Sequence, residues 1–268
     1  MKIGILGCGN MSSAIVKCIH SKRKEIQFNT FTPSKTRSVK LSKEVNGVHH
    51  SELSSFLREN YDLVVIACKP QQVEALSLDV ENALAGKVIV SILAGISIDT
   101  ISRLFNSDFI CRVMPNTPSE FGEGISLIHS SVKVLDETNS KIMNLFKNCG
   151  LVISTKTEEE LDELTVFSGS GPAYIYRFAL AYQRDLLNRG YSETESRSLL
   201  NQLFVGTSVL MSNSEDSLSD LVDKVSSKKG VTLEAVKILN EKNLDEIVSL
   251  STKSAHLRAK QIAQEIKF

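Results

Sequence analysis

The pattern of hydrophobic and polar positions divides the chain into two halves. Up to about Thr155, short apolar runs alternate with segments whose apolar residues recur every three or four positions. The runs predict strands at Lys2–Leu6, Ile26–Thr32, Leu63–Cys68, Val88–Ile92, Phe109–Val113, Ile125–His129 and Leu151–Ser154. The periodic segments predict helices at Ser13–Ile19, Ser34–Glu44, Ser97–Phe105 and Asp136–Asn148. Since such alternation is typical of a sheet covered on both faces, we expect an α/β domain with a mostly parallel sheet.

Beyond Thr155 the chain has only helical periodicity. Residues Ala173–Arg189 are apolar over most of the helix circumference and end at Gly190, which predicts a deeply buried helix. The Ser192–Glu195 capping box predicts the start of the next helix. Two further amphipathic helices are expected at Val231–Leu239 and Ile247–Ile266. The second half is therefore predicted to be all-helical, and we expect a domain boundary between residues 158 and 159.

Composition narrows the class of protein. The chain has 31 Lys and Arg against 31 Asp and Glu, so its formal net charge is zero, which argues against nucleic acid as a partner. The five cysteines are widely spaced without a C-x-x-C pair, which favours reduced thiols and a cytoplasmic protein. The chain opens on an apolar strand, which leaves no room for a signal peptide, and no apolar run reaches membrane-spanning length. We expect a soluble protein without a membrane partner.

The first predicted strand leads through a glycine turn into the first helix. In the string Gly7-Cys8-Gly9-Asn10-Met11-Ser12, Gly7 would allow the tight turn and Gly9 would let backbone approach a pyrophosphate. The phosphate charge would then lie on the amides at the helix amino terminus. Ser12 takes the third glycine position and is small enough for helix and strand to pack closely. This context predicts a dinucleotide site, with a purely structural turn as the alternative.

The end of the second predicted strand bears on the choice of cofactor. A site for NAD usually places an acid here to bind the ribose 2′-hydroxyl. The string Thr32-Pro33-Ser34-Lys35-Thr36-Arg37 has no acid, and its hydroxyl, ammonium and guanidinium groups suit a 2′-phosphate. We therefore expect NADP(H), with NADPH preferred over NADH. The alternative is a basic helix start that is only solvated.

Three further strings combine turn residues with groups that bind ligands. Arg112–Pro118 reads Arg-Val-Met-Pro-Asn-Thr-Pro and follows a strand, and Phe167–Tyr174 reads Phe-Ser-Gly-Ser-Gly-Pro-Ala-Tyr between the halves. Val225–Thr232 reads Val-Ser-Ser-Lys-Lys-Gly-Val-Thr and enters a helix, where free amides and hydroxyls suit a small carboxylate. Each string alone is equally compatible with ordinary turn chemistry.

Together with Ala67-Cys68-Lys69-Pro70, these strings resemble the Δ1-pyrroline-5-carboxylate reductase family over essentially the whole chain. The resemblance implies a Rossmann-type NAD(P)-binding domain at 1–158 and an all-helical dimerisation and substrate domain at 159–268. It also implies NAD(P)H as hydride donor, reduction of L-Δ1-pyrroline-5-carboxylate to L-proline, and a homodimer or a higher oligomer of dimers.

By the same resemblance, the site residues fall into two groups. The residues expected to contact the cofactor are Leu6, Gly7, Cys8, Gly9, Asn10, Met11, Thr32, Pro33, Ser34, Lys35, Arg37, Ala67, Cys68, Lys69, Pro70, Ile92, Leu93 and Ala94. Those expected to hold the substrate are Glu215, Ser227, Gly230, Val231 and Thr232. The Thr232 hydroxyl would bond the imine nitrogen region and Glu215 would favour its cationic form, as the two catalytic residues. The proton would come from one of them or from water, and no metal is expected.

The chain departs from the family in the substrate loop. Where the family has Ser-Pro-Gly-Gly-Thr-Thr, this chain has Lys228-Lys229 in place of Pro-Gly and Val231 before the retained Thr232. This leaves two alternatives open: an NADP-binding paralogue that is non-catalytic or regulatory, and a reductase of a related cyclic imine. A β-hydroxyacid dehydrogenase is disfavoured because Pro172–Leu187 contains no lysine. The five histidines fall outside the motif strings.

Overall fold

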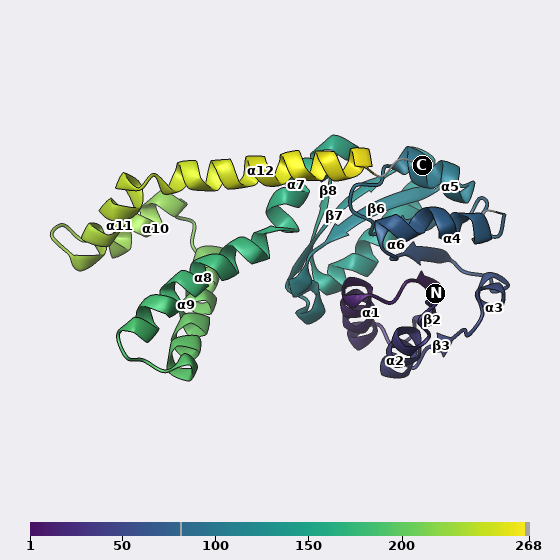
Figure 1. Cartoon of the computed structure of the whole chain (residues 1–268), viewed down its shortest axis with the longest axis horizontal. Coiled ribbons are helices and arrows are strands. Elements are labelled where there is room, and N and C mark those ends of the chain that lie inside the picture. The colour runs from purple at the N-terminus through teal and green to yellow at the C-terminus, as the bar shows by residue number, and fades with distance from the viewer. Residues whose placement is uncertain (81, 266–268) are drawn as a thin grey trace. The chain divides into compact units, whose positions relative to one another are not determined.

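The computed structural model describes residues 1–80 and 82–265 (Figure 1). Contacts divide the chain into two units, Met1–Pro172 together with the residues from Ala255 onward, and Ala173–Ser254. The predicted end of the last helix at Ile266 lies outside the described residues. Each unit is described by itself below.

The first unit is built on one eight-stranded sheet in the order β3-β2-β1-β4-β5-β6-β7-β8. Strands β1 to β6 run parallel, and β7 pairs antiparallel with β6 and parallel with β8. The strands are β1 (Lys2–Leu6), β2 (Gln27–Phe31), β3 (Val48–His49), β4 (Leu63–Ile66), β5 (Ile89–Ser91), β6 (Ile110–Pro115), β7 (Gly124–Ser130) and β8 (Gly150–Ser154). The predicted fold class, a mostly parallel sheet followed by helices, is confirmed.

Helices cover both faces of this sheet. Alternate residues of β4 show the division, because Leu63 and Val65 pack into one apolar core and Val64 and Ile66 into the other. The first core contains residues of α1 (Asn10–Lys22), α2 (Thr36–Glu44) and α6 (Asp136–Phe146). The second contains residues of α3 (Leu53–Leu57), α4 (Val73–Val80) and α5 (Ile98–Phe105). Burial on both faces explains why these strands read as unbroken apolar runs.

Short helices complete the connections of the first unit. They are the 3-10 helices η1 (Pro70–Gln72), η2 (Thr117–Phe121) and η3 (Lys147–Cys149). The helix α7 (Glu158–Ser168) follows β8, and its Leu161 packs with Met114 and Leu127 of the sheet. A Thr157 side chain accepts a hydrogen bond from the Glu160 amide and so fixes the start of α7.

The second unit is all-helical, as predicted. Its helices are α8 (Gly171–Asn188), α9 (Glu193–Asn213), α10 (Leu218–Val225), α11 (Val231–Glu241) and α12 (Leu244–Glu265), the first and last of which extend across the unit boundaries. The capping box of Ser192 and Glu195 at the start of α9 is formed. Among the described residues of the chain, no helix is both long and apolar enough to cross a membrane.

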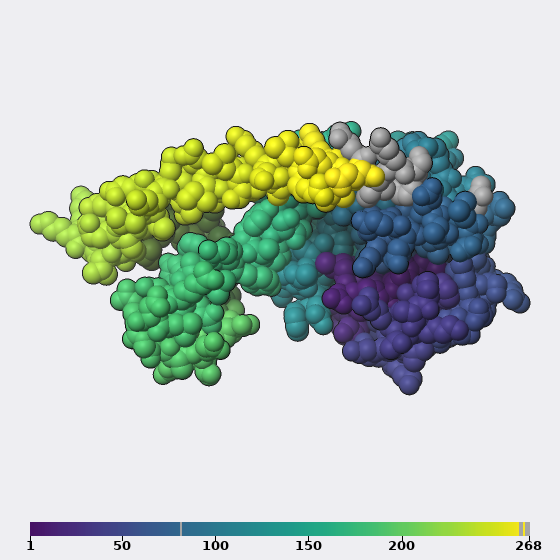
Figure 2. All heavy atoms as spheres, viewed as in Figure 1, coloured from purple at the N-terminus to yellow at the C-terminus, as the bar shows by residue number. Residues whose placement is uncertain are grey.

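The prediction that Ala173–Arg189 is deeply buried is wrong for the single chain. Not one residue of α8, all of which are described, is buried, and α9 buries only Ser196 and Leu200. In the space-filling view, atoms of these helices, drawn in green, face the viewer (Figure 2). The physical reason is that five helices joined in sequence present more apolar surface than they cover among themselves. The helix α8 does carry apolar side chains, as predicted, but the single chain leaves them exposed or only partly buried.

Candidate active site

A cleft of about 880 Å³ lies at the carboxyl edge of the sheet. It is formed by the segments that follow β1, β2, β3 and β4, at the point where the chain order reverses beside β1. Ligands of open α/β sheets bind at such switch points. Predicted cofactor residues lining the cleft are Leu6, Gly7, Cys8, Gly9, Thr32, Pro33, Ser34, Lys35, Arg37, Ala67, Cys68 and Lys69.

The glycine turn at the centre of this cleft has a fixed geometry. Gly7 has φ +100°, and a Cβ there would lie 2.5 Å from the Ala67 carbonyl carbon. Gly9 is open, because an added Cβ would meet nothing within 4 Å among the described residues. Ser12 is buried and its hydroxyl donates to the Gly7 carbonyl at 2.9 Å. The Ser12 hydroxyl thus stabilises the turn through its hydrogen bond to Gly7, and the backbone at Gly9 stays accessible to a ligand.

Two thiols in the cleft are neutral. Burial raises the pKa of the Cys8 thiol to about 12 and that of Cys68 to about 11. The Cys8 side chain belongs to the apolar core, and its Sγ lies 3.9 Å from the Phe31 carbonyl oxygen. Because both thiols stay protonated near neutral pH, they add no negative charge that would repel a phosphate.

The end of β2 brings positive charge into the cleft. Lys35 has φ +50° and ψ −50°, and the Thr36 amide donates to the Ser34 carbonyl, which makes a γ-turn. The turn leads into α2, where Arg37 lies exposed in the first turn. Both basic side chains line the cleft beside the amino terminus of α2, where amides without helical partners add to the positive potential.

Other predicted cofactor residues lie outside the lining of the cleft. Asn10 and Met11 begin α1, and Pro70 begins η1. Ile92, Leu93 and Ala94 follow β5 on the same edge of the sheet, but the Leu93 side chain is buried in the apolar core. Leu93 is 1% exposed as a whole residue, and its amide donates to the Ser91 hydroxyl at 3.3 Å.

The cleft also contains residues that the sequence analysis did not select. These are Phe31, Ser51, Glu52, Leu53, Gln71, Gln72, Ala75, Leu76 and Asp79. Most of them follow β3 or belong to η1 and α4, elements that the apolar pattern did not predict. Glu52 is the most consequential, since its carboxylate lies 3.4 Å from the Lys35 ammonium. The sequence offers only the polar pair Ser51-Glu52 as a signal here, and two residues are too few to identify the end of a strand.

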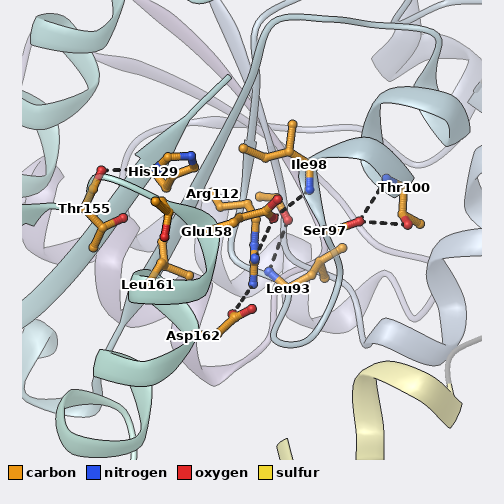
Figure 3. A network of polar contacts seen from close by, with 12 residues as sticks. Leu93, Ser97, Ile98, Thr100, Arg112, His129, Thr155, Glu158, Leu161 and Asp162 are labelled. Carbon is orange, nitrogen blue, oxygen red and sulfur yellow. Dashed lines mark hydrogen bonds and ion pairs between the residues drawn. The ribbon is translucent and has the colours of Figure 1, made fainter. Parts of the chain in front are cut away.

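Arg112 of β6 is almost completely buried and paired with two acids of α7 (Figure 3). Its Nη1 lies 2.6 Å from Glu158 Oε1, and its Nη2 lies 2.8 Å from Asp162 Oδ1. The same Glu158 oxygen accepts a hydrogen bond from the Ile98 amide at 2.8 Å. Glu158 therefore joins β6, α7 and the start of α5, next to the loop after β5.

The Arg112–Pro118 and Phe167–Tyr174 strings are in contact inside the first unit. Asn116 is buried, and its Nδ2 donates to the Ser168 carbonyl at 2.9 Å. Its Oδ1 accepts from the Ile125 amide at 2.8 Å. Asn116 thus ties the loop after β6 to the beginning of the Ser168–Gly171 turn.

The predicted substrate residues lie in the second unit. Ser227 to Gly230 form a β-turn in which the Gly230 amide donates to the Ser227 carbonyl at 2.8 Å. Lys229 has φ +65°, a conformation that glycine adopts more readily. Gly230 is the N-cap of α11, so Val231 and Thr232 begin that helix and both are exposed. Glu215 precedes α10, and within the described residues no hydrogen bond or ion pair joins it to this loop.

Comparisons with known proteins agree with this architecture. Residues 2–95 match the family model described as NADP oxidoreductase, coenzyme F420-dependent. Residues 158–262 match the model described as pyrroline-5-carboxylate reductase dimerisation. The fold, the cleft at the switch point and these two matches define an NAD(P)H-dependent oxidoreductase with a helical dimerisation domain.

Relatives that match over nearly their full length identify the family within this class of oxidoreductases. The chain is 30% identical to pyrroline-5-carboxylate reductase of Vibrio alginolyticus over 97% of both chains. It is 29% identical to the Aquifex aeolicus enzyme of the same name, over 98% of this chain and 97% of that one. A crystal structure of Plasmodium falciparum pyrroline carboxylate reductase with NADP bound superposes with a TM-score of 0.86, at 25% identity over 98% of both chains. The chain belongs to the pyrroline-5-carboxylate reductase family.

Proposed function

We propose that this chain reduces L-Δ1-pyrroline-5-carboxylate to L-proline with NAD(P)H, the last step of proline biosynthesis. The observation that carries the proposal is the cleft at the switch point, where the Gly7–Gly9 turn and the basic end of β2 converge in a chain of this family. The relative from Plasmodium falciparum was crystallised with NADP bound.

The residues of the cleft fit a dinucleotide phosphate. Gly9 leaves its backbone uncovered, and Lys35 and Arg37 supply positive charge for a 2′-phosphate. When bound, the reduced nicotinamide supplies a hydride. We assign its contacts to the same residues expected from the sequence, Leu6 to Met11, Thr32 to Lys35 with Arg37, Ala67 to Pro70, and Ile92 to Ala94. NADPH is the preferred donor because the end of β2 itself carries no acid.

The substrate carboxylate is assigned to the turn at the start of α11. The amides near Gly230 and the Thr232 hydroxyl lie at a helix amino terminus, which favours an anion. Thr232 bonds the imine nitrogen region and Glu215 favours its cationic form, and a protonated imine is the better hydride acceptor. Ser227 and Val231 complete the proposed contacts. The chain's main contribution is then to orient two ligands and exclude water.

We also propose the domain boundary between residues 158 and 159, and a homodimer as the smallest active assembly. The helical unit supports a dimer because its apolar side chains remain exposed in the single chain. The matched dimerisation model begins at residue 158, although α7 packs on the sheet of the first unit.

A steady-state assay of the purified full chain tests the activity. We expect consumption of NADPH that depends on pyrroline-5-carboxylate, with L-proline as the product. Saturable NADPH binding without turnover would instead indicate a regulatory paralogue. Faster turnover of a six-membered cyclic imine carboxylate would indicate a related reductase, and either result would contradict the proposal.

A further inference from the structure

Glu52 brings a carboxylate into the part of the cleft assigned to the 2′-phosphate. Its Oε1 lies 3.4 Å from Lys35 Nζ, and both residues line the cleft together with Ser34 and Arg37. Lys35 follows β2 and Glu52 follows β3, which pair in parallel, so their segments leave the sheet side by side. The acid that is missing from the end of β2 is thus supplied by the segment that follows the neighbouring strand.

The Glu52 carboxylate is not required to build the fold around it. Its backbone carbonyl accepts from the Ser55 and Phe56 amides at 3.2 and 3.3 Å and so starts α3. The Glu52 side chain makes no cap hydrogen bond to α3 within the described residues. Replacing the carboxylate by an amide therefore keeps the backbone contacts that position residue 52.

Lys35 is held in place by its backbone. Its amide donates to the Thr32 carbonyl at 3.0 Å, and its own carbonyl accepts from the Val39 amide at 2.9 Å. These bonds keep Lys35 in the strained γ-turn, with φ +50°. Backbone hydrogen bonds thus position both Lys35 and Glu52, while more than half of each side chain is exposed to solvent.

We propose that Glu52 is a specificity-determining residue that limits the preference for NADPH and keeps NADH usable. In this inference, which rests on the proposed function, the carboxylate neutralises the Lys35 ammonium and repels a 2′-phosphate. It also accepts a hydrogen bond from a ribose 2′-hydroxyl, the contact that acids make in NAD sites. The Glu52 charge thus favours one cofactor and opposes the other.

The test is the ratio of NADPH to NADH dissociation constants, measured by calorimetry on the full-length chain at low ionic strength. Because exposed ion pairs have modest energies, Glu52→Gln should tighten NADPH by about three- to tenfold and should not tighten NADH. Asp79→Asn is the matched control, because it removes one negative charge from the same cleft. Asp79 forms no ion pair within the described residues, so its replacement should change both affinities alike.

A double-mutant cycle separates the action through Lys35 from direct repulsion. In a Lys35→Met background, Glu52→Gln should raise NADPH affinity by a smaller factor than in the wild type. A Glu52→Gln variant with the wild-type cofactor ratio would overturn the role of Glu52. Equal binding of NADPH and NADH by the wild type would instead contradict the proposed NADPH preference. A fall in the ratio of NADPH to NADH dissociation constants on Glu52→Gln would still support this inference.

Discussion

The Asn116 side chain donates from Nδ2 to the backbone carbonyl of Ser168 at 2.9 Å, across 52 residues of sequence. Asn116 is 4% exposed, and its Oδ1 is also used, by the Ile125 amide. An amide is the side chain that both donates and accepts here, so the contact depends on residue type as well as size. Asn116 therefore joins the Pro-Asn-Thr string to the backbone at the start of the Ser-Gly-Ser-Gly string.

Asn116→Asp should destabilise the first unit in a pH-dependent way. A carboxylate still accepts from Ile125 but cannot donate to Ser168, and an unsatisfied buried group costs about 1–3 kcal/mol. Burial raises the pKa of a carboxyl above its unfolded value, so the protonated form is favoured in the folded state. The deficit against wild type in urea unfolding should therefore be largest near neutral pH and shrink in acid. Asn144→Asp is the control, because it makes the same substitution at an exposed position of α6. A deficit independent of pH would contradict this reading of the contact.

Much of the fold could be predicted because burial on both faces leaves a clear pattern. The strand Leu63–Ile66 is apolar at every position, since its alternate residues fill opposite cores. The pattern fails where burial is slight. Val48–His49 is only two residues long and half open, so β3 and the cleft residues that follow it were not predicted. The sequence predicts burial of α8, whereas none of its residues is buried in the single chain. Apolar side chains indicate that a helix face favours burial, but they do not indicate whether the same chain or a second one covers that face.

Residues of the cleft could be predicted where a local string carries a backbone requirement, as at Gly7, or a cluster of charge, as at Lys35 and Arg37. Gly7 could be identified because its positive φ and close neighbours require glycine. Glu52 and Asp79 reach the cleft through pairing of strands and packing of helices, which no local string encodes. The partners of Arg112, at positions 158 and 162, were likewise invisible because they are joined only in three dimensions.

Wild-type protein should bind NADPH more tightly than NADH, and Arg37→Ala should reduce that difference. A hydrogen bond to a charged group is worth about 1.5–3 kcal/mol, and exposure of Arg37 sets the expected loss of NADPH affinity at about tenfold. NADH affinity should hardly change. Arg23→Ala, which removes an exposed arginine outside the cleft, is the control for net charge. Fluorescence titration of both cofactors measures the effect, and equal wild-type affinities would remove the argument.

The chain should be a dimer at micromolar concentration. Leu203, Val205 and Val209 of α9 are 42–58% exposed in the single chain, an arrangement that favours burial against a second copy. Leu203→Asp should therefore shift the mass in light scattering towards the monomer. Val132→Asp, which alters a fully exposed apolar residue of the sheet unit, should leave the mass unchanged. A monomeric wild type would contradict the prediction.

The Ser227–Gly230 turn, which is proposed to bind the substrate, contains a residue in a strained backbone conformation. Lys229 occupies a position with φ +65° that the Pro-Gly of the family would fill without strain, yet the Gly230 amide still reaches the Ser227 carbonyl. The amides at the start of α11 thus remain available to a carboxylate despite the two lysines.

Thr232→Ala tests whether this turn binds the substrate. Loss of a hydrogen bond to a charged ligand costs about 1.5–3 kcal/mol, so KM should rise or kcat should fall by roughly ten- to a hundredfold. NADPH affinity should stay nearly unchanged, because Thr232 is assigned to the substrate alone. Thr252→Ala is the matched control, since the Thr252 hydroxyl bonds the Val248 carbonyl of its own helix at 3.1 Å. If Thr232→Ala reduces pyrroline-5-carboxylate as well as the wild type does, Thr232 serves only the start of α11 and the contact assigned to it with the substrate is wrong.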